Sequence, residues 1–245
     1  MKRIAILLVL VATSGFAGEV QSVAGVIKAP LHWKAKEWKR FGEGVALVAA
    51  VAAVDKPVID AVQRNRTHFS DQFARRITPL GGHDAVLASI ALFGTGFVLH
   101  DDRLRGAGRD SLEAEVVAAM LVTPALKRAF GRSRPFLDEG TYHFEPARGN
   151  SDAHESFPSG HATNAFAAAT AIAGHYDNWI VPTIVYSIAA GVSISRVNDN
   201  VHFPSDVVAG ALIGRAVGKG MLARHHIAIV PQKNGFLLIY RRAGE

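Results

Sequence analysis

Apolar residues gather in runs that short polar segments separate. The runs are rich in Ala, Val, Leu and Ile, and none shows the strict alternation of a half-buried strand. They cover residues 45–54, 85–99, 116–126, 162–174, 179–195 and 207–214. The pattern therefore predicts an all-α protein, a bundle of about six helices.

The length of these runs bears on whether the bundle crosses a membrane. Each uncharged run is 17 residues or shorter, against roughly 20 needed to span a bilayer. Pro124 and Pro182 fall within two of the runs as expected helix breakers. We therefore expect an exported, periplasmic bundle that is associated with a membrane surface. An integral membrane protein whose active site faces the periplasm is the alternative.

The two ends of the chain differ from the helical middle. Residues 1–17 combine a basic start, an apolar core and a small-residue exit, which is typical of a signal peptide cleaved after Ala17. Residues 30–40 are basic and contain Trp33 and Trp38; they suit a membrane surface or a first helix packed on the bundle. Residues 227–240 predict a β-hairpin with a turn at Asn234-Gly235. Residues 18–245 are expected to form a single domain.

Composition narrows the range of partners. The 245 residues carry a formal net charge of +6, which favours anionic partners. The basic residues are scattered without a long Lys/Arg run, so we expect no nucleic acid partner. Cysteine is absent, which excludes disulfides and thiolate metal sites.

Residues 156–163, Ser-Phe-Pro-Ser-Gly-His-Ala-Thr, look like a helix N-terminus that binds an anion. Free backbone N–H groups and the positive end of the helix dipole meet at such a position. Ser159 adds a hydroxyl, Gly160 allows close backbone approach, and His161 adds a titratable proton. The alternative is a Ser159 N-cap followed by a surface histidine.

Two further clusters flank that stretch. Lys127 and Arg134 lie seven residues apart at the end of an apolar helix, which Gly131 and Pro135 are expected to terminate. This cluster could instead be a solvated basic helix end. Further on, His202 and Asp206 are four apart, so the carboxylate can accept the Nδ1–H of the imidazole and leave Nε2 free.

Together these residues resemble a known three-part signature. Lys127 with six residues to Arg134-Pro135, then Pro158-Ser159-Gly160-His161, then Ser195-Arg196 with five residues to His202 and three more to Asp206, is similar to the type-2 phosphatidic acid phosphatase superfamily. That superfamily includes bacterial class A acid phosphatases and vanadium-dependent haloperoxidases. The resemblance covers about residues 85–220 and implies a helical bundle of that type.

The resemblance also implies roles for the residues. His202 would attack phosphorus and form a phosphohistidine, Asp206 would orient its ring, and His161 would protonate the leaving oxygen. The nonbridging oxygens would be bound by Lys127, Arg134, Arg196, Ser159 and the N–H of Gly160. The scheme needs no metal and no cofactor. His143, His154 and Glu155 are expected in the loop that leads to the site, where they could shape the substrate pocket.

Three functions follow from this signature. The first is a phosphatase that hydrolyses phosphate monoesters or diphosphates of lipids, with a broad-range periplasmic acid phosphatase on soluble esters as its alternative. The second is a haloperoxidase that holds vanadate in the same pocket. The third is a non-catalytic envelope protein that binds anionic lipid.

Overall fold

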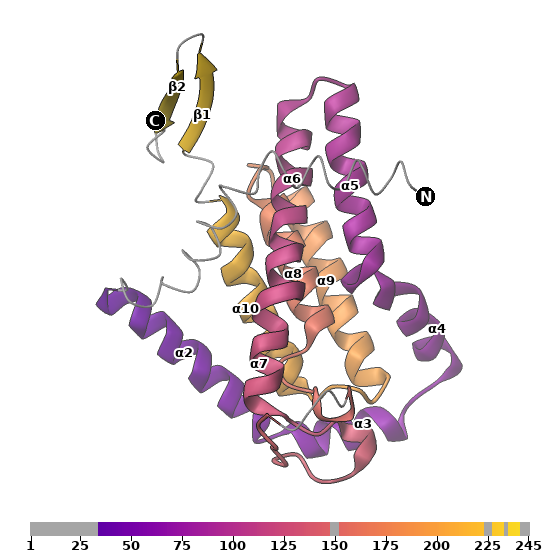
Figure 1. Ribbon diagram of the computed structural model, residues 1–245. Coiled ribbons are helices and arrows are strands. Elements are labelled where there is room, and N and C mark those ends of the chain that lie inside the picture. Colours follow the sequence, from indigo (N-terminus) through magenta and orange to yellow (C-terminus); the bar gives the residue numbers. More distant parts are fainter. Residues whose placement is uncertain (1–33, 148–151, 223–226, 233–234, 241–245) are drawn as a thin grey trace. The chain divides into compact units, whose positions relative to one another are not determined.

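The computed structural model describes residues 34–147, 152–222, 227–232 and 235–240, and Figure 1 shows its elements. Contacts divide the chain into two units, Met1–Glu43 and Gly44–Glu245. The α-helices are α2 (Ala35–Ala52), α3 (Asp55–Arg64), α4 (His68–Ile77), α5 (His83–Val98), α6 (Asp102–Val117), α7 (Thr123–Phe130), α8 (Gly160–Ala173), α9 (Ile180–Asn198) and α10 (Pro204–Leu222). The short elements are the 3₁₀ turns η2 (Thr78–Gly81), η4 (Pro135–Leu137) and η5 (Asp152–His154), and the π-helical η3 (Ala118–Val122). The predicted signal peptide at residues 1–17 lies outside the described residues.

The described core is helical as predicted, but six helices were too few. Helices α3 and α4 were missed because charged and polar residues dominate them, so they form no apolar run. Thr67 marks the start of α4, since its hydroxyl accepts a hydrogen bond from the N–H of Ser70, and the hydroxyl of Ser70 accepts one from the N–H of Thr67. Such polar helices are found from their caps and not from hydrophobic periodicity.

Pro124 does not break its helix. Residues 102–130 run as α6, η3 and α7 in succession, and the π-helical turn η3 comes immediately before the proline. A proline lacks the N–H that an α-helix needs at that position, and a π-turn changes the local pairing of the backbone. Pro182 lies in the first turn of α9, where proline is tolerated. Both expected breaks are therefore wrong.

Helix α8 lies against α6, α9 and α10, and its contact with α10 is the most extensive. The two helices approach closely because small residues line both. A Cβ added to Gly210, Gly214 or Gly218 would come within 2.2–2.7 Å of a carbonyl oxygen in the segment Ser159–Ala167. This close packing fixes the start of α10, which carries Asp206, against the start of α8, which carries His161.

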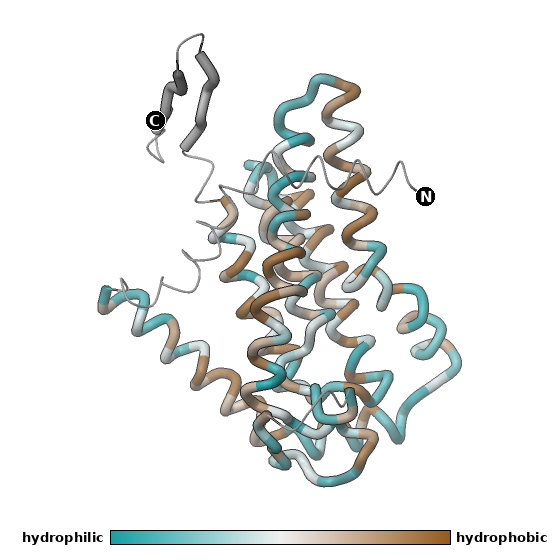
Figure 2. The backbone as a smooth tube through the Cα atoms, viewed as in Figure 1, coloured by the Kyte–Doolittle hydropathy of each residue, from teal (hydrophilic) through white to brown (hydrophobic). Residues whose placement is uncertain are grey.

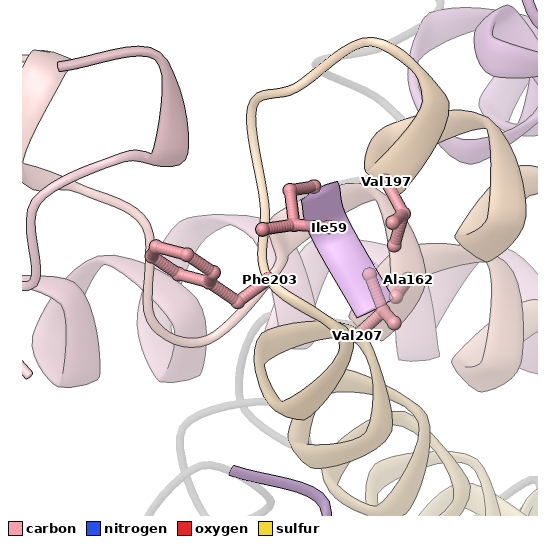
Figure 3. Packing of buried hydrophobic residues seen from close by; sticks show 5 residues of the cluster. All are labelled: Ile59, Ala162, Val197, Phe203 and Val207. Carbon is pink, nitrogen blue, oxygen red and sulfur yellow. The ribbon is translucent and has the colours of Figure 1, made fainter. Parts of the chain in front are cut away.

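A small apolar cluster closes the end of the bundle where these helices begin. Figure 3 shows Ile59 of α3 beside Val197 of α9, with Ala162, Phe203 and Val207 completing the cluster. All five side chains are buried. Since burial of apolar surface stabilises the fold, the cluster holds α3 against the segment between α9 and α10.

The C-terminal residues form strands β1 (Ile227–Gln232) and β2 (Gly235–Tyr240), which pair antiparallel. Residues 233–234, at the expected turn, lie outside the described residues, and no side chain of the strands is described. The turn of the hairpin and the packing of the two strands on the helices therefore remain predictions.

One described helix, α9, is long and apolar enough to cross a membrane, and the bent pair His68–Gly81 and His83–Val98 would make a second such span. Helix α9 begins one residue after the start of the apolar run 179–195 and continues past its end to Asn198, so that it has 19 residues.

Candidate active site

The first cluster ends its helix where the sequence indicated. Helix α7 stops at Phe130, and Gly131 caps it in the left-handed region with φ of 58°. Arg134 follows in extended backbone, and its N–H donates to the carbonyl of Ala153. The chain therefore turns back after Lys127, so Arg134 lies beside the segment that leads into α8.

Ser159 is the N-cap of α8, and its hydroxyl accepts a long hydrogen bond of 3.5 Å from the N–H of Ala162. The capping interpretation of Ser159 is thus confirmed, and its contact with phosphate stays a prediction. Gly160 faces the first cluster, because a Cβ there would lie 3.3 Å from Thr123 and 4.0 Å from Cε of Lys127. A side chain at this position would occupy the space beside the lysine.

His161 is no surface histidine, because it is partly buried and packs on the glycine pair at the start of α5. A Cβ on Gly81 would come 2.9 Å from the carbonyl oxygen of His161, and one on Gly82 would lie 3.5 Å from its Nε2. The sequence showed this pair only as a break between runs. Its role is to let the backbone approach the imidazole closely.

The charge around His161 shows that the three clusters meet. Burial, together with the nearby basic groups of Arg196, His202, Lys127 and Arg134, lowers the pKa of His161 to about 4. Four basic groups can act on one imidazole in this way only when all of them lie near it. In the empty site His161 is therefore neutral at pH 7.

Two arginines present unused donors to this site. Within the part of the chain that the structure describes, the Nε–H groups of Arg134 and Arg196 are buried and make no hydrogen bond. Two hydrogen bonds fix the position of Arg196, since its Nη1 donates to the hydroxyl of Thr78 at 2.8 Å and to the carboxylate of Asp199 at 3.0 Å. Buried donors without a partner are costly, so an anion between the two guanidinium groups would be stabilised.

Carboxylates lie next to two of these cations. Asp152 accepts a hydrogen bond from Arg134, and Glu155 lies 3.7 Å from Nζ of Lys127. Burial and Arg134 lower the pKa of Lys127, and Glu155 opposes them. The two carboxylates therefore partly offset the positive charge of Arg134 and Lys127.

The structure corrects the expected contact of His202. Its Nδ1 lies 2.7 Å from the carbonyl oxygen of Ser156 and 3.8 Å from the nearest oxygen of Asp206, which is too far for a hydrogen bond. A carbonyl only accepts, so Nδ1 carries the proton and Nε2 keeps its lone pair. The spacing of four residues brought the carboxylate near the ring, but Ser156 fixes the tautomer.

Asp206 belongs to a buried network that the sequence did not reveal. It accepts hydrogen bonds from the hydroxyl of Ser156 at 2.6 Å, from the N–H of Phe203 at 2.8 Å and from Arg132 at 2.6 Å. Burial favours the protonated carboxyl, but His202, the charge of Arg132 and the hydrogen bond from Ser156 outweigh it and hold the pKa of Asp206 below its usual value. Asp206 is therefore an anion.

Arg132 is the centre of that network and was not among the expected residues. Its side chain is 2% exposed and pairs with Asp206 and, at 2.8 Å, with Asp55. The guanidinium also lies 4.3 Å from the ring centroid of Phe203. Asp55, at the start of α3, in turn accepts from the N–H of Ser205. Nothing in the sequence separated Arg132 from its basic neighbours or pointed to Asp55.

Comparison with known proteins relates the sequence of this chain to a family. Residues 113–228 match the sequence model of the PAP2 superfamily. Over this segment the chain is similar to members of that superfamily. The match covers all eight residues expected in the site.

Two curated relatives show what kinds of protein this chain is similar to. The lipid A 1-phosphatase of Rhizobium johnstonii is 44% identical over 101 residues, which is 40% of this chain and 40% of the relative. The decaprenylphosphoryl-5-phosphoribose phosphatase of Mycobacterium tuberculosis is 29% identical over 181 residues, 72% of this chain and 87% of the relative. The chain thus spans about two fifths of the first relative's length.

Solved structures share the fold of this chain. The transmembrane PAP2-type phosphatidylglycerolphosphate phosphatase of Bacillus subtilis aligns with a TM-score of 0.55 and 24% identity, over 75% of this chain and 92% of that one. Aquifex aeolicus LpxE aligns with a TM-score of 0.51 and 24% identity, over 69% and 95%. These likenesses confirm the helical architecture.

Proposed function

We propose that this chain is a phosphatase that hydrolyses lipid phosphates, as monoesters or diphosphates, through a phosphohistidine on His202. The observation that carries the proposal is the pair of buried, unpaired Nε–H groups of Arg134 and Arg196 beside His161. Arginine donors of this kind suit phosphoryl oxygens. Lys127, Ser159 and the N–H of Gly160 complete the proposed phosphate site.

The tautomer of His202 supports its role as nucleophile. Nδ1–H donates to Ser156, so the Nε2 lone pair attacks phosphorus while the bond from phosphorus to the leaving oxygen breaks. The ring becomes cationic in this step, and the anionic Asp206 at 3.8 Å stabilises that charge. The cationic walls stabilise the oxygens as charge develops on the transferring group.

His161 completes the cycle as acid and base. It transfers a proton to the leaving oxygen in the first step and accepts one from the attacking water in the second. The water attacks phosphorus while the bond from phosphorus to Nε2 breaks, which releases phosphate and restores neutral His202. This scheme requires that His161 be protonated when the substrate is bound.

The low pKa of His161 in the empty site leads to a test. A phosphate dianion offsets the surrounding positive charge, so we expect binding to raise the pKa of His161 from about 4 and to take up a proton. Proton uptake is expected at pH values between the pKa of His161 in the free protein and its pKa in the phosphate complex. Phosphate affinity is expected to fall as the pH rises through the pKa of the complex. Calorimetry at pH 6.5 in two buffers of different ionisation enthalpy measures the number of protons taken up.

His161→Asn provides the control for that measurement, because it removes the imidazole but leaves the titration of phosphate itself unchanged. The wild type is expected to take up more protons than the variant, by up to about one per site. Equal uptake by the two proteins would remove His161 as the general acid.

Two observations favour lipid over soluble esters. The relatives that match are named for lipid phosphates, among them lipid A and a decaprenyl phosphate derivative. Large apolar side chains are also exposed on α9 and at the end of α5, and Figure 2 shows hydrophobic residues along much of α5. The exposed members on α9 include Ile180, Ile184 and Ile188, which lie four residues apart on one face. We therefore place the enzyme at a membrane, with export to the periplasm as part of the proposal.

Hydrolysis rates on three substrates test this function. We expect kcat/KM for phosphatidic acid and for an isoprenyl diphosphate, both in detergent micelles, to exceed that for p-nitrophenyl phosphate by at least tenfold. Equal or greater efficiency on the soluble ester would favour the broad-range acid phosphatase. Absence of hydrolysis with all three substrates would refute the phosphatase.

A further inference from the structure

The loop between α7 and α8 carries a cluster of imidazoles and carboxylates outside the phosphate site. Glu139 and His143 come from the outer part of the loop, and His154 comes from η5. The three residues offer one nitrogen or oxygen atom each, and these atoms all lie within 4.8 Å of one another. Backbone bonds set this arrangement, because Ser133 donates to the carbonyl of His143 at 3.1 Å and Arg134 donates to that of Ala153 at 2.9 Å.

We propose that Glu139, His143 and His154 form a binding site for a divalent transition metal of the zinc class. Oε2 of Glu139 lies 3.1 Å from Nδ1 of His143 and 3.3 Å from Nε2 of His154. Ligand bonds of about 2.0–2.2 Å in a tetrahedral site place neighbouring donor atoms about 3.3–3.6 Å apart. A small rearrangement of the side chains therefore suffices to bind the ion.

The surroundings of the cluster match those of a metal site. Nε2 of His143, the ring nitrogen that faces away from Glu139, lies 3.4 Å from Oε1 of Glu145. The hydroxyl of Ser133 donates to Oε2 of Glu139 at 2.6 Å. Carboxylates behind a metal-bound imidazole and donors to a metal-bound carboxylate orient the ligands of metal sites.

The chemistry of the donors selects the ion. Two imidazoles and one carboxylate suit zinc and its neighbours in the first transition row better than magnesium or calcium, which prefer oxygen ligands alone. Three protein ligands leave a fourth position for water.

The metal would act on the structure of the loop and not on the reaction. Ser133 stands between Arg132, which holds Asp206, and Arg134, which faces the phosphate site. An ion that joins Glu139 and His143 to His154 closes the loop from residue 139 to residue 154. Because closing a loop reduces the freedom of the chain, the ion is expected to raise the thermal midpoint of the protein. This inference does not depend on the proposed phosphatase activity.

Zinc titration of the full chain, stripped with a chelator and then freed of it, tests the site by calorimetry. We expect one equivalent of Zn²⁺ to bind, and His143→Ala to weaken binding at least 100-fold. Glu145→Gln, which leaves all three ligands in place, is expected to weaken it by about tenfold. Co²⁺ in place of Zn²⁺ should give the visible absorption of a four-coordinate ion.

Two controls separate this site from others. His100→Asn removes an imidazole from the turn between α5 and α6 and should leave binding unchanged. Joint replacement of the sequence neighbours His225 and His226 by glutamine should also leave it unchanged. Wild-type protein that shows no saturable one-site binding would overturn the proposal without any variant. Binding that survives in folded His143→Ala but is lost in the His225/His226 variant would assign the ion elsewhere and overturn it too.

Discussion

Replacing His202 with glutamine is expected to lower turnover by about 10⁴-fold or more, since loss of a covalent nucleophile has effects of that size. The glutamine amide can still donate to the carbonyl of Ser156, which now holds Nδ1 at 2.7 Å. Lys127, Arg134 and Arg196 are untouched, so phosphate is expected to bind with an affinity within about tenfold of the wild type. Turnover assays together with phosphate titration separate the two effects.

The covalent step has its own measurement. Rapid mixing with radiolabelled substrate, followed by a base quench, should trap label on the wild-type protein and none on His202→Gln. Phosphohistidine survives base and not acid, which distinguishes it from phosphoserine. His100→Asn serves as the matched control and should keep full activity. A His202→Gln protein with wild-type turnover would defeat the whole mechanism.

Replacing Arg132 with methionine is expected to lower the free energy of unfolding by about 3–5 kcal/mol, because it leaves buried Asp55 and Asp206 without their common partner. It should also lower kcat more than it raises KM, because Arg132 acts on Asp206 and not on the phosphate site. Urea unfolding and steady-state kinetics measure the two effects.

A pH profile tells whether Arg132 also positions the catalytic groups. The charge of Arg132 helps to hold the pKa of Asp206 below its usual value. Without the charge of Arg132 the pKa of Asp206 rises. As the pH is lowered, the variant is therefore expected to lose activity at a higher pH than the wild type. Arg132→Lys keeps the charge and should restore part of the profile. Arg128→Lys, on the exposed end of α7, is the matched control. An unchanged profile in folded Arg132→Met would limit Arg132 to a structural role.

The sequence by itself determined the helical class and the residues of the three clusters. Apolar runs in helical lengths predict helices because burial of such faces drives folding. Gly131 ended α7 and Ser159 capped α8 as expected, since backbone geometry at helix ends depends on the residue itself and its nearest neighbours. The spacing within each cluster was sufficient to identify the superfamily.

Polar helices and long-range partners could not be predicted in the same way. Helices α3 and α4 owe their position to tertiary contacts and have no apolar run to reveal them. The π-turn before Pro124 kept a helix continuous that local rules would have ended. The hairpin at residues 227–240, the signal peptide and the domain boundaries stay predictions.

Only the tertiary structure decided how the site works. Asp206 lies four residues from His202, yet the Nδ1–H of His202 donates to the carbonyl of Ser156. The carboxylate of Asp206 accepts hydrogen bonds from Arg132 and from the hydroxyl of Ser156 instead. Asp55 reaches this network from 77 residues before Arg132. A buried charge must find a partner wherever the fold supplies one, and distance along the chain does not limit that choice. The sequence therefore indicated which groups are candidates for the chemistry, and the packing of α3, α8 and α10 decided which of them touch.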